Sequence, residues 1–502
     1  MRKTKIICTL GPATDDDNTL TAMLRAGMNV ARLNFSHGTH EEHAQRIERI
    51  LRLRRETGAP LGILLDTKGP EIRIGTFADG KIRLSAGQLF TLTTQETEGT
   101  SERVWVNYPN LPSELHEGAR LLIDDGLIAM TVVRLTATDV VCRVENSAPL
   151  SSRKSINLPG IPLRLPYLSE RDRADLRFGA QYPADFIAAS FVRSADDIRV
   201  LKTFLLEENL LPNVRIIAKI ENREGFDHLS EILDVADGIM IARGDMGVEV
   251  PFSELPQMQK RIIKQCISRG RLVITATQML DSMTSRPRPT RAEVSDVANA
   301  VYDGTGAVML SGETSVGHDP AAVVQTMAEI CVRAEQCIHY ARRRRTRLEF
   351  EHLRPNVDRV TAGMTQATVT AAETLDCAAI VAITDSGRTP IALSSYRPEK
   401  PLIGAAPDEQ TFHRLSLYWG ILPLRCERPT SDAMLYRESI RAAVQSGLCR
   451  PDDLLILTAG MPVGEAQFTN TIRVHRISVQ DFREFGKNPK KFTDNSQFDT
   501  VL

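Results

Sequence analysis

The sequence predicts an α/β protein: a closed (β/α)8 barrel with an inserted β domain, followed by a smaller α/β domain. Three observations predict this fold. Short apolar runs rich in β-branched residues alternate with stretches long enough for a crossover helix. One long segment with a different, alternating pattern interrupts the repeat. A second set of strand-like and helix-like segments follows it.

The predicted barrel strands are eight apolar runs. Each run is short and nearly continuous, which is typical of a parallel strand buried on both faces. Eight such units close into a barrel whose active site lies at the carboxyl ends of the strands. The runs cover residues 4–10, 29–33, 61–65, 186–191, 215–220, 238–242, 272–277 and 307–310.

The interruption after the third strand predicts a small β-barrel domain over residues 70–163, so that the main barrel comprises residues 1–69 and 164–340. Alternating patterns in KIRLSAGQLFTLTT and RVWVNY indicate half-buried strands, and LLIDDGLIAM predicts a hairpin that turns on Asp125-Gly126. Because the insert lies on a βα connection, we expect it at the mouth of the barrel, where it can act as a lid.

Residues 341–477 predict the second α/β domain, with strands at 380–384, 402–405, 454–458 and 471–474. The domain opens with the basic run ARRRRTR at 341–347. We interpret this run as a solvated helix end, with a surface for an acidic partner as the alternative. Residues 478–502 are polar with little periodicity, and we expect them to form a loosely ordered tail.

The composition excludes several classes of protein. The 502 residues carry a formal net charge of −1, which gives no general attraction to nucleic acid or acidic membranes. We find no signal-peptide pattern and no apolar run near the ~18 residues of a membrane span. The eight cysteines are scattered, which fits buried thiols in a reducing compartment. A cytoplasmic protein is therefore expected.

Polar side chains follow six of the eight predicted strands. Because the carboxyl ends of barrel strands meet at one mouth, we expect these side chains to converge there. A single charged residue at a strand end is often only solvated, but six such ends on one face favour a functional site. The segments are RLNFSHG at 32–38, DTKGPEIR at 66–73, KIEN at 219–222, RGD at 243–245, TATQ at 275–278 and SGET at 311–314.

The residue types at these strand ends indicate metal-assisted phosphoryl transfer. Glu221 and Asp245 are two hard oxygen ligands, which are too few to enclose Ca²⁺ but suit Mg²⁺ or Mn²⁺ with further ligands from substrate and water. Arg32, Arg73 and Lys219 are cations that can hold a phosphorylated anion. Phosphoryl transfer depends on this combination of positioning and charge neutralisation.

Two further features of the strand ends suit small ions. Gly244 has no side chain, so a substrate can reach the backbone N–H groups that lead into the next helix. A second, oxygen-rich cluster carries only one formal charge, which suits a monovalent cation; a hydrogen-bonded polar network explains the same residues equally well. This cluster consists of Asn34, Ser36, Asp66 and Thr67.

The strand-end motifs resemble those of one family, the pyruvate kinases. The match runs in the family's order from about residue 4 to about residue 474. It implies transfer of the phosphoryl group of phosphoenolpyruvate to ADP, with Mg²⁺ (or Mn²⁺) and K⁺ as cofactors, and a homotetramer. The matching segments are MNVARLNFSHG, LLDTKGPEIR, AKIENREG, IMIARGDMGVEVP, ITATQMLDSM, RPRPTRAEVSDVANAVYDGTGAVMLSGET and FTNTIRV.

The resemblance assigns substrate and metal roles. Lys219 resembles the lysine that stabilises the transferring phosphoryl group, and Arg32 resembles a substrate-phosphate contact. Glu221 and Asp245 match the divalent-metal ligands. The substrate carboxylate pocket is matched by Gly244, Asp245 and Thr277. The K⁺ ligands are matched by Asn34, Ser36, Asp66 and Thr67.

The resemblance also assigns nucleotide contacts, with one departure. Glu71 is the residue type of K⁺-dependent members, whereas K⁺-independent members have lysine there. Ser155 stands where the family usually has glycine, and its Cβ next to Lys154 can alter lid closure. The nucleotide-binding positions are matched by Asn34, His37, Arg73 and Lys154.

Loss of the phosphoryl group leaves an enolate, whose methylene carbon must then take a proton. We expect Thr277 to lie near that carbon. A threonine hydroxyl is a poor acid alone, so Thr277 is the end of a relay rather than the source of the proton. Ser311 and Glu313 are the residues that can pass the proton through water.

The segment TDSGRT at 384–389 follows a strand and opens a helix, which suits a phosphate group. It lacks the spacing and the lysine of a Walker loop. It resembles the family's effector loop for sugar phosphates, faced by GMPVGEAQFTNT, with an ordinary capped helix as the alternative. Asp385 adds a negative charge that can weaken a phosphate ligand. The candidate effector-binding residues are Thr384, Ser386, Gly387, Arg388 and Thr389.

Three other hypotheses compete with the kinase. A metal-dependent aldolase or lyase acting on pyruvate enolates would share Glu221 and Asp245 but would need neither the nucleotide contacts nor the lid. Cell adhesion through Arg243-Gly244-Asp245 would need an exposed loop in a secreted chain. A pseudoenzyme would need a lost catalytic residue, and none is missing. We expect Arg243 to be structural, or to bridge to a neighbouring subunit.

Overall fold

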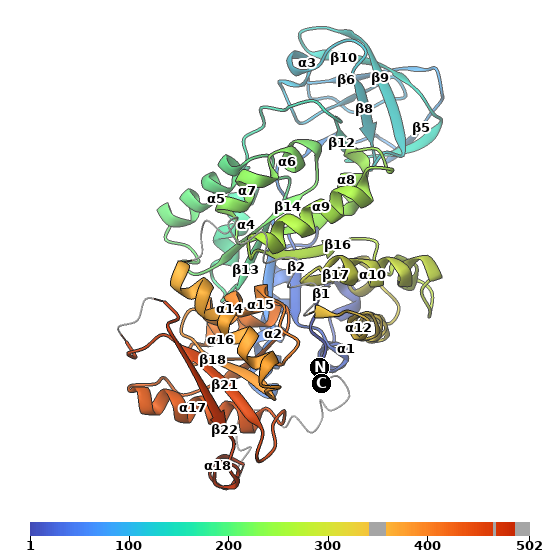
Figure 1. Cartoon of the computed structure of the whole chain (residues 1–502). Helices are drawn as coiled ribbons and strands as arrows, with labels where there is room; N and C mark the ends of the chain where they lie inside the picture. Colours follow the sequence, from blue (N-terminus) through green and yellow to red (C-terminus); the bar gives the residue numbers. More distant parts are fainter. Residues whose placement is uncertain (341–357, 465–467, 487–502) are drawn as a thin grey trace.

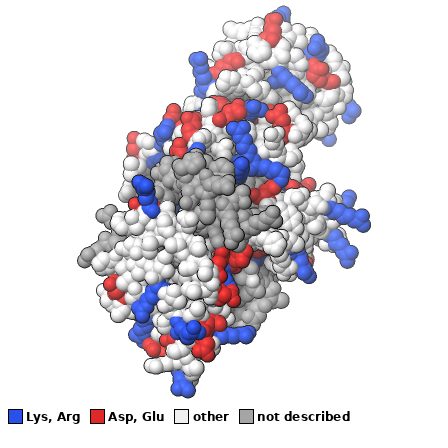
Figure 2. All heavy atoms as spheres, viewed as in Figure 1, with Lys and Arg blue, Asp and Glu red and all other residues white. Residues whose placement is uncertain are grey.

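The computed structural model describes residues 1–340, 358–464 and 468–486. Three units follow one another along the molecule: a β-rich lid at one end, a barrel in the middle and an α/β unit at the other end (Figure 1). On the face drawn in Figure 2, acidic and basic side chains are interspersed, in keeping with a formal net charge of −1. The basic run at 341–347 lies outside the described residues.

The middle unit is the closed, parallel, eight-stranded barrel that the sequence predicts. Each predicted strand is present, and its ends differ from the prediction by at most two residues. The strands are buried because helices cover the outside of the barrel and apolar side chains fill its inside. They are β1 (Lys5–Thr9), β2 (Val30–Asn34), β3 (Gly62–Asp66), β13 (Phe186–Ala189), β14 (Arg215–Ile220), β15 (Gly238–Ala242), β16 (Leu272–Ala276) and β17 (Ala307–Leu310).

The helices around the barrel begin and end at residues whose types predict such ends. The helix at His40–Thr57 starts after Thr39, whose hydroxyl accepts from the Glu42 N–H, and it ends at Gly58 in the left-handed conformation. The helices are α1 (Asp17–Ala26), α2 (His40–Thr57), α4 (Glu170–Gly179), α5 (Ala195–Glu207), α6 (Arg223–Asp227), α7 (Leu229–Val235), α8 (Arg243–Glu249), α9 (Leu255–Ser268), α10 (Arg291–Asp303), α11 (Gly312–Ser315) and α12 (Pro320–Gln336), with 3₁₀ turns η1 (Pro12–Thr14) and η2 (Asp281–Thr284).

The inserted unit is all β apart from one helical turn. Its main sheet has seven strands, in the order β4-β12-β8-β9-β10-β6-β7. A bridge between Ile74 and Val106 joins the two edges, so the sheet curls towards a small barrel. The predicted hairpin is confirmed as β8 paired with β9. The elements are β4 (Ile72–Arg73), β5 (Lys81–Leu84), β6 (Leu89–Thr93), β7 (Arg103–Trp105), α3 (Leu111–Glu114), β8 (Arg120–Ile123), β9 (Ile128–Leu135), β10 (Asp139–Val144), β11 (Ala148–Ser151) and β12 (Ser155–Asn157).

The lid touches the barrel at α8. Asn157, at the end of β12, donates a hydrogen bond of 3.2 Å to the Glu249 carboxylate. A Cβ on Gly126, in the lid hairpin, would lie 3.6 Å from Val248 Cγ1. The lid therefore rests on the same short helix that begins with Arg243-Gly244-Asp245.

The C-terminal unit has a five-stranded sheet in the order β20-β19-β18-β21-β22, with β22 antiparallel. The prediction missed β20, an edge strand that contains Pro423, a residue type that argues against a strand. The elements are α14 (Arg359–Thr374), β18 (Ala379–Ile383), α15 (Arg388–Ser395), β19 (Leu402–Ala406), α16 (Glu409–Arg414), η4 (Leu415–Leu417), β20 (Ile421–Arg425), α17 (Asp432–Gln445), β21 (Leu454–Ala459), β22 (Thr471–Arg476) and α18 (Val479–Phe485).

The prediction of a loosely ordered tail is wrong for the first residues of that segment, which form α18. The Ser478 side chain accepts from the Asp481 N–H, and the Asp481 side chain accepts from the Ser478 N–H. This capping box is a helix-start signal in the sequence, which the polar composition of the segment obscured. Phe485 is buried, and Arg437 on α17 pairs with Glu484. Residues 487–502 lie outside the described residues, and the domain boundaries proposed above stay predictions.

The C-terminal unit closes the end of the barrel opposite the lid. Barrel-interior residues such as Ile7, Phe186 and Met240 share one buried cluster with Leu415 and Leu417 of η4.

All eight cysteines are free; Cys337 is exposed and Cys426 is half-buried, so burial holds for the others only. No helix within the described ranges is both long and apolar enough to cross a membrane.

Candidate active site

The candidate site lies at the carboxyl ends of the barrel strands, because each chain segment leaves the apolar barrel wall there. Asn34 and Asp66 end β2 and β3 and are register partners, so they lie side by side. Lys219 is the last residue but one of β14, and Glu221 directly follows that strand. The α8 helix, which carries Asp245, begins directly after β15.

A buried ionic network joins three of these segments. Arg32 Nε lies 2.7 Å from Asp66 Oδ2, and Lys219 Nζ lies 3.0 Å from Asp66 Oδ1. Burial by itself would raise the pKa of Asp66, but the Arg32 guanidinium and the Lys219 ammonium hold it below its usual range. Burial likewise opposes the charge on Lys219, yet Asp66 and Glu221 raise the pKa of its ammonium. Both groups are therefore charged.

Glu221 and Asp245 form a pair of neighbouring carboxyl groups. Burial raises the pKa of Glu221, and the Asp245 charge adds to this rise against the opposing charge of Lys219. Burial also raises the pKa of Asp245, whereas its hydrogen bond to Glu221 acts to lower that pKa. Two buried carboxyls that resist ionisation together form a set of donors that a divalent cation would stabilise. Within the described residues no group of three or more His, Cys, Asp or Glu side chains that could hold a metal ion occurs.

The strand β16 ends in a backbone conformation that is rare for residues other than glycine. Thr277 has φ 67° and Gln278 has φ 51°. Thr277 Oγ1 accepts from the Gly244 N–H at 2.8 Å and lies 2.7 Å from the Ala276 carbonyl, to which it donates. A Cβ on Gly244 would make only ordinary contacts with Thr277, so protein packing alone does not require glycine there.

Arg243, the first residue of the RGD tripeptide, points into the barrel rim. Its guanidinium donates to the carbonyls of Ala276 and Thr277, at 3.2 and 2.6 Å, and to Asp296 at 2.6 Å. The side chain is 9% exposed. The tripeptide is therefore not an exposed adhesion loop, and Arg243 is structural, as expected, with partners in its own chain.

The oxygen-rich cluster is partly occupied by protein donors. Asn34 Oδ1 accepts from the Ser36 N–H at 3.1 Å, and Thr67 Oγ1 accepts from the Ser190 N–H at 3.1 Å. Asp66 has both oxygens in ion pairs. Asn34 and Asp66 are register partners, and Ser190 contacts both Asp66 and Thr67. This arrangement is compatible both with a cation site and with a polar network.

The predicted nucleotide-binding residues lie along the joint between barrel and lid. His37 is exposed. Arg73 Nε pairs with Glu71 at 2.7 Å, and Arg73 Nη1 donates to the Arg153 carbonyl. Lys154 pairs with Asp124 of the lid at 2.8 Å. Because β4 pairs with β12, Arg73 lies opposite Ser155, one residue from Lys154.

The predicted relay residues differ in their surroundings. Glu313 is 1% exposed, and its oxygens accept from the backbone N–H groups of Ser311 and Leu280, at 2.6 and 3.2 Å. Ser311 Oγ is buried without a hydrogen-bond partner among the described residues. An unpaired buried hydroxyl is a place where a water molecule or ligand atom can bind.

The candidate effector loop forms a tight turn before α15. Thr384 Oγ1 accepts from the Gly387 N–H at 2.9 Å, and Gly387 has φ 83°. Thr389 and Thr469 share a buried hydrogen bond of 2.7 Å. Asp385 pairs with Arg428 at 2.7 Å, so its charge is compensated locally. Part of the predicted facing loop, 465–467, lies outside the described residues.

The end of the fourth barrel strand also contributes to the site, although it was not among the predicted strand ends. Ser190 Oγ lies 2.7 Å from Lys219 Nζ, and the Phe191 N–H donates to Glu221. Phe191 has φ 54°, a further rare conformation at the rim. The rule that identified the other strand ends applies equally to AASF at 188–191, so the signal was present.

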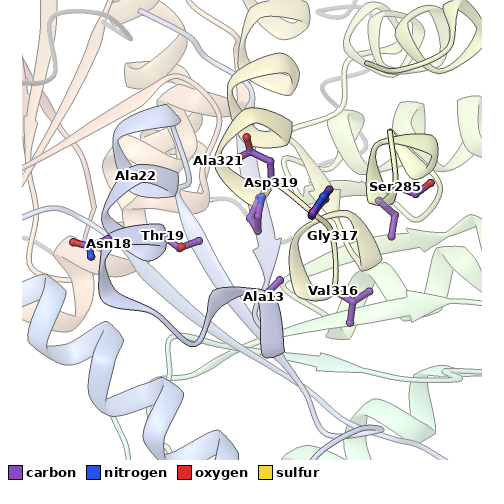
Figure 3. Close-up of a pocket in the computed structure, with 12 residues that line it drawn as sticks. Ala13, Asn18, Thr19, Ala22, Ser285, Val316, Gly317, Asp319 and Ala321 are labelled. Atoms are coloured by element: carbon purple, nitrogen blue, oxygen red, sulfur yellow. The ribbon is translucent and has the colours of Figure 1, made fainter. Parts of the chain in front are cut away.

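Two hollows open near the rim. One, of about 330 Å³, lies between lid and barrel and is lined by Asp125 of the lid and Asp245. The other, of about 760 Å³, lies beside α1 and the start of α12 and is lined by residues such as Thr19, Ser285 and Val316 (Figure 3). The second hollow contains none of the predicted site residues, so the chemistry belongs at the lid side.

A (β/α)8 barrel that gathers cations around buried carboxylates at its mouth suits an enzyme of the phosphotransferase class. Comparison with known proteins agrees. The family profile described as "Pyruvate kinase, barrel domain" matches residues 1–324, and "Pyruvate kinase, alpha/beta domain" matches residues 363–475. The chain belongs to the pyruvate kinase family, and the aldolase or lyase alternative is not favoured.

Individual relatives cover nearly the whole chain. A pyruvate kinase of Geobacillus stearothermophilus is 46% identical over 479 residues. Those of Sporosarcina psychrophila and Staphylococcus saprophyticus are 45% and 46% identical over 482 residues. Each alignment covers 95% of this chain and 81% of the relative. Membership of the family implies a general dependence on a divalent metal ion and a monovalent cation.

Proposed function

We propose that the mouth of the barrel transfers the phosphoryl group of phosphoenolpyruvate to ADP, giving ATP and pyruvate. The observation that carries this proposal is the Lys219 ammonium, buried between Asp66 and Glu221 with Arg32 beside it. Fixed cations next to a carboxylate pair suit a reaction in which negative charge moves between phosphate oxygens.

Glu221 and Asp245 would hold Mg²⁺ (or Mn²⁺), and the raised pKa of each carboxyl supports this assignment. When bound, the ion supplies positive charge that polarises the phosphoryl oxygens. Lys219 and Arg32 hold the transferring group and offset its charge. Both side chains are fixed by Asp66 before substrate arrives, so little reorganisation is needed.

At the other side of the site, Gly244, Asp245 and Thr277 hold the substrate carboxylate. Departure of the phosphoryl group leaves an enolate, and Thr277 ends the relay that delivers a proton to its methylene carbon. Ser311, whose hydroxyl lacks a partner in the described part of the chain, passes the proton through water, and Glu313 orients the Ser311 backbone.

The nucleotide lies along the joint between barrel and lid, where Asn34, His37, Arg73 and Lys154 contact its phosphates. Arg73 and Lys154 are each paired with an acidic residue, Glu71 and Asp124, which keeps these cations in place in the absence of nucleotide. Ser155 donates to Asp125 rather than crowding Lys154, so the departure from glycine is compatible with this contact.

K⁺ would bind to the oxygens of the cluster Asn34, Ser36, Asp66 and Thr67. A phosphorylated metabolite would bind at the loop of residues Thr384, Ser386, Gly387, Arg388 and Thr389, where the pairing of Asp385 with Arg428 removes an obstacle to an anion. A homotetramer in the cytoplasm completes the proposal, in line with the resemblance.

The proposal is tested by replacing Lys219 with Met and measuring pyruvate formation in a coupled assay. Turnover should fall by at least ~10²-fold, because a fixed electrostatic stabiliser of the transferring group is lost. Lys202→Met, on the exposed side of α5, is the matched control and should retain wild-type turnover. Wild-type turnover in Lys219→Met would contradict the role of Lys219. Cleavage of 2-oxo acids without any need for ADP would restore the lyase alternative.

A further inference from the structure

Ser190, at the end of the fourth barrel strand, contacts the central lysine of the site. It follows β13 and is 1% exposed. Its hydroxyl accepts a hydrogen bond of 2.7 Å from Lys219 Nζ and donates one of 2.6 Å to the Thr67 carbonyl. We propose that Ser190 is a positioning residue for Lys219 in phosphoryl transfer, an inference that rests on the proposed function.

The donors of Lys219 are all engaged. An ammonium group has three N–H donors and no acceptor. Here three acceptors surround it: Asp66 Oδ1 at 3.0 Å, Glu221 Oε1 at 3.0 Å and Ser190 Oγ at 2.7 Å. Every donor of Lys219 thus has a partner, and the ammonium must release one of them to contact a phosphoryl oxygen.

The three partners are not equally free to release Lys219. Asp66 is also bound to Arg32, and Ser190 is also bound to Thr67. Glu221 also accepts from the Phe191 N–H, through Oε2. Its Oε1, which contacts Lys219, has a second use when the site is loaded, because Glu221 is a proposed metal ligand. We infer that Asp66 and Ser190 keep two N–H groups fixed while the third is directed at the substrate.

Ser190 is itself held firmly enough to act as a reference point. Its N–H donates to Thr67 Oγ1 at 3.1 Å, and its carbonyl accepts from the Tyr167 hydroxyl at 3.2 Å. Its single hydroxyl proton is directed at the Thr67 carbonyl or, at 3.2 Å, at Asp66 Oδ1. Either way, a lone pair of the oxygen remains for Lys219.

The surroundings of Ser190 decide which variants are informative. A Cβ on the adjacent Gly69 would come within 2.9 Å of Ser190 Cβ, so the protein is tightly packed on that side. Threonine at position 190 would add an atom to this crowded space. Ser190→Ala only removes the hydroxyl, so it removes the contact without adding bulk. Ser190→Cys replaces the hydroxyl with a somewhat larger thiol, which is a much weaker acceptor.

The first experiment measures steady-state kinetics of Ser190→Ala in the coupled assay. We expect kcat to fall about 10-fold or more, with KM for phosphoenolpyruvate within about 3-fold of wild type, because a charge-assisted hydrogen bond that aims the ammonium is lost. Ser439→Ala is the matched control, since Ser439 is 2% exposed and its hydroxyl donates to the Leu435 carbonyl, a contact within α17. If Ser190→Ala fails to fold, Ser190→Cys is measured instead and should show the same loss.

The second experiment combines Ser190→Ala with Lys219→Met. A residue that acts through Lys219 should cost less than about 2-fold in kcat once Lys219 is absent, because the two changes remove the same interaction. An equal fold loss in both backgrounds would overturn the positioning role, as would wild-type kcat in Ser190→Ala. A wild-type enzyme without ADP-dependent turnover would overturn the proposed function and this inference together.

Discussion

The guanidinium of Arg243 is bound to the carboxylate of Asp296, 2.6 Å away on α10. The same guanidinium donates to the Thr277 carbonyl at 2.6 Å. The first residue after β15 is thus tied to the end of β16 and to the helix that follows it. Arg243 supports the rim from behind, while Asp245 faces the predicted metal site.

The variant Arg243→Met should impair activity without touching the substrate. Thr277 and Gln278 have positive φ values, which persist only when neighbouring contacts hold them. We expect kcat/KM to fall at least about 10-fold and the free energy of unfolding to fall by about 1–3 kcal/mol, because the carbonyls of Ala276 and Thr277 each lose a donor. Steady-state kinetics and urea denaturation measure the two effects. Arg199→Met, which replaces an exposed arginine on α5, is the control, and wild-type kinetics in Arg243→Met would contradict the bracing role.

Activity should depend on K⁺ if the cluster around Asp66 binds a monovalent cation. In buffers whose cation is tetramethylammonium, which is too large for oxygen ligands to surround closely, we expect turnover to fall at least about 10-fold. Adding K⁺ at constant ionic strength should restore it along a saturation curve, because site binding saturates whereas screening does not. Full activity without K⁺ and Na⁺ would instead support the polar-network hypothesis.

Stability should respond to pH through Lys5, which lies between the barrel and the C-terminal unit. Its ammonium is 6% exposed and donates to the Ile421 carbonyl at 2.7 Å. Burial lowers the pKa of Lys5 to about 7, below its unfolded value of 10.5. Below about pH 7 both states are protonated and the folded state carries the full cost of the buried charge. Between pH 7 and 10.5 only the unfolded state holds the proton, so this cost diminishes as pH rises.

The variant Lys5→Met should therefore gain stability over wild type most at pH 6 to 7. The gain should shrink by up to about 1.4 kcal/mol per pH unit towards pH 10. Urea denaturation at several pH values measures the difference, which cancels other titrating groups. Lys81→Met, an exposed lysine of the lid, is the control and should show a flat difference. A flat difference for Lys5→Met would mean that the Lys5 pKa is close to normal.

Arg414 should couple the effector loop to the barrel. Its guanidinium donates to the Ser386 carbonyl at 3.1 Å and to the Asn213 carbonyl at 2.8 Å. Asn213 lies just before β14, the strand that carries Lys219. We expect Arg414→Met to retain turnover at saturating substrate within about 2-fold but to lose most of the response to an activating sugar phosphate.

The Arg414 prediction is measured as the half-saturating concentration of phosphoenolpyruvate with and without a panel of sugar phosphates and nucleoside monophosphates. Arg476→Met is the matched control, because Arg476 is an exposed arginine of β22 that donates to the Asp452 carbonyl and lies outside the effector loop. A response of Arg414→Met equal to wild type would remove Arg414 from the coupling. A wild-type enzyme that responds to no member of the panel would contradict the effector site itself.

Much of the site could be predicted because a repeating parallel barrel fixes where strand ends lie. Lys219, Glu221 and Asp245 follow apolar runs, and the barrel closure that brings such ends together is a consequence of the repeat. Local sequence signals were less dependable for an edge strand and for the C-terminal segment. Pro423 concealed an edge strand, and the polarity of residues 478–486 concealed a capped helix.

The fold class and the types of residue at the barrel mouth could be predicted from the amino-acid sequence, since both follow from local patterns and from resemblance. The identity of the hydrogen-bonded and ion-paired atoms depends on the folded arrangement of the strands. That Asp66 is shared by Arg32 and Lys219, that Ser190 binds Lys219 and that Arg243 points inward depend on segments more than 25 residues apart in the chain. Hydrogen bonds form only at contact distance and in the right direction. Packing of the strands against one another sets those distances, and no single segment contains that information.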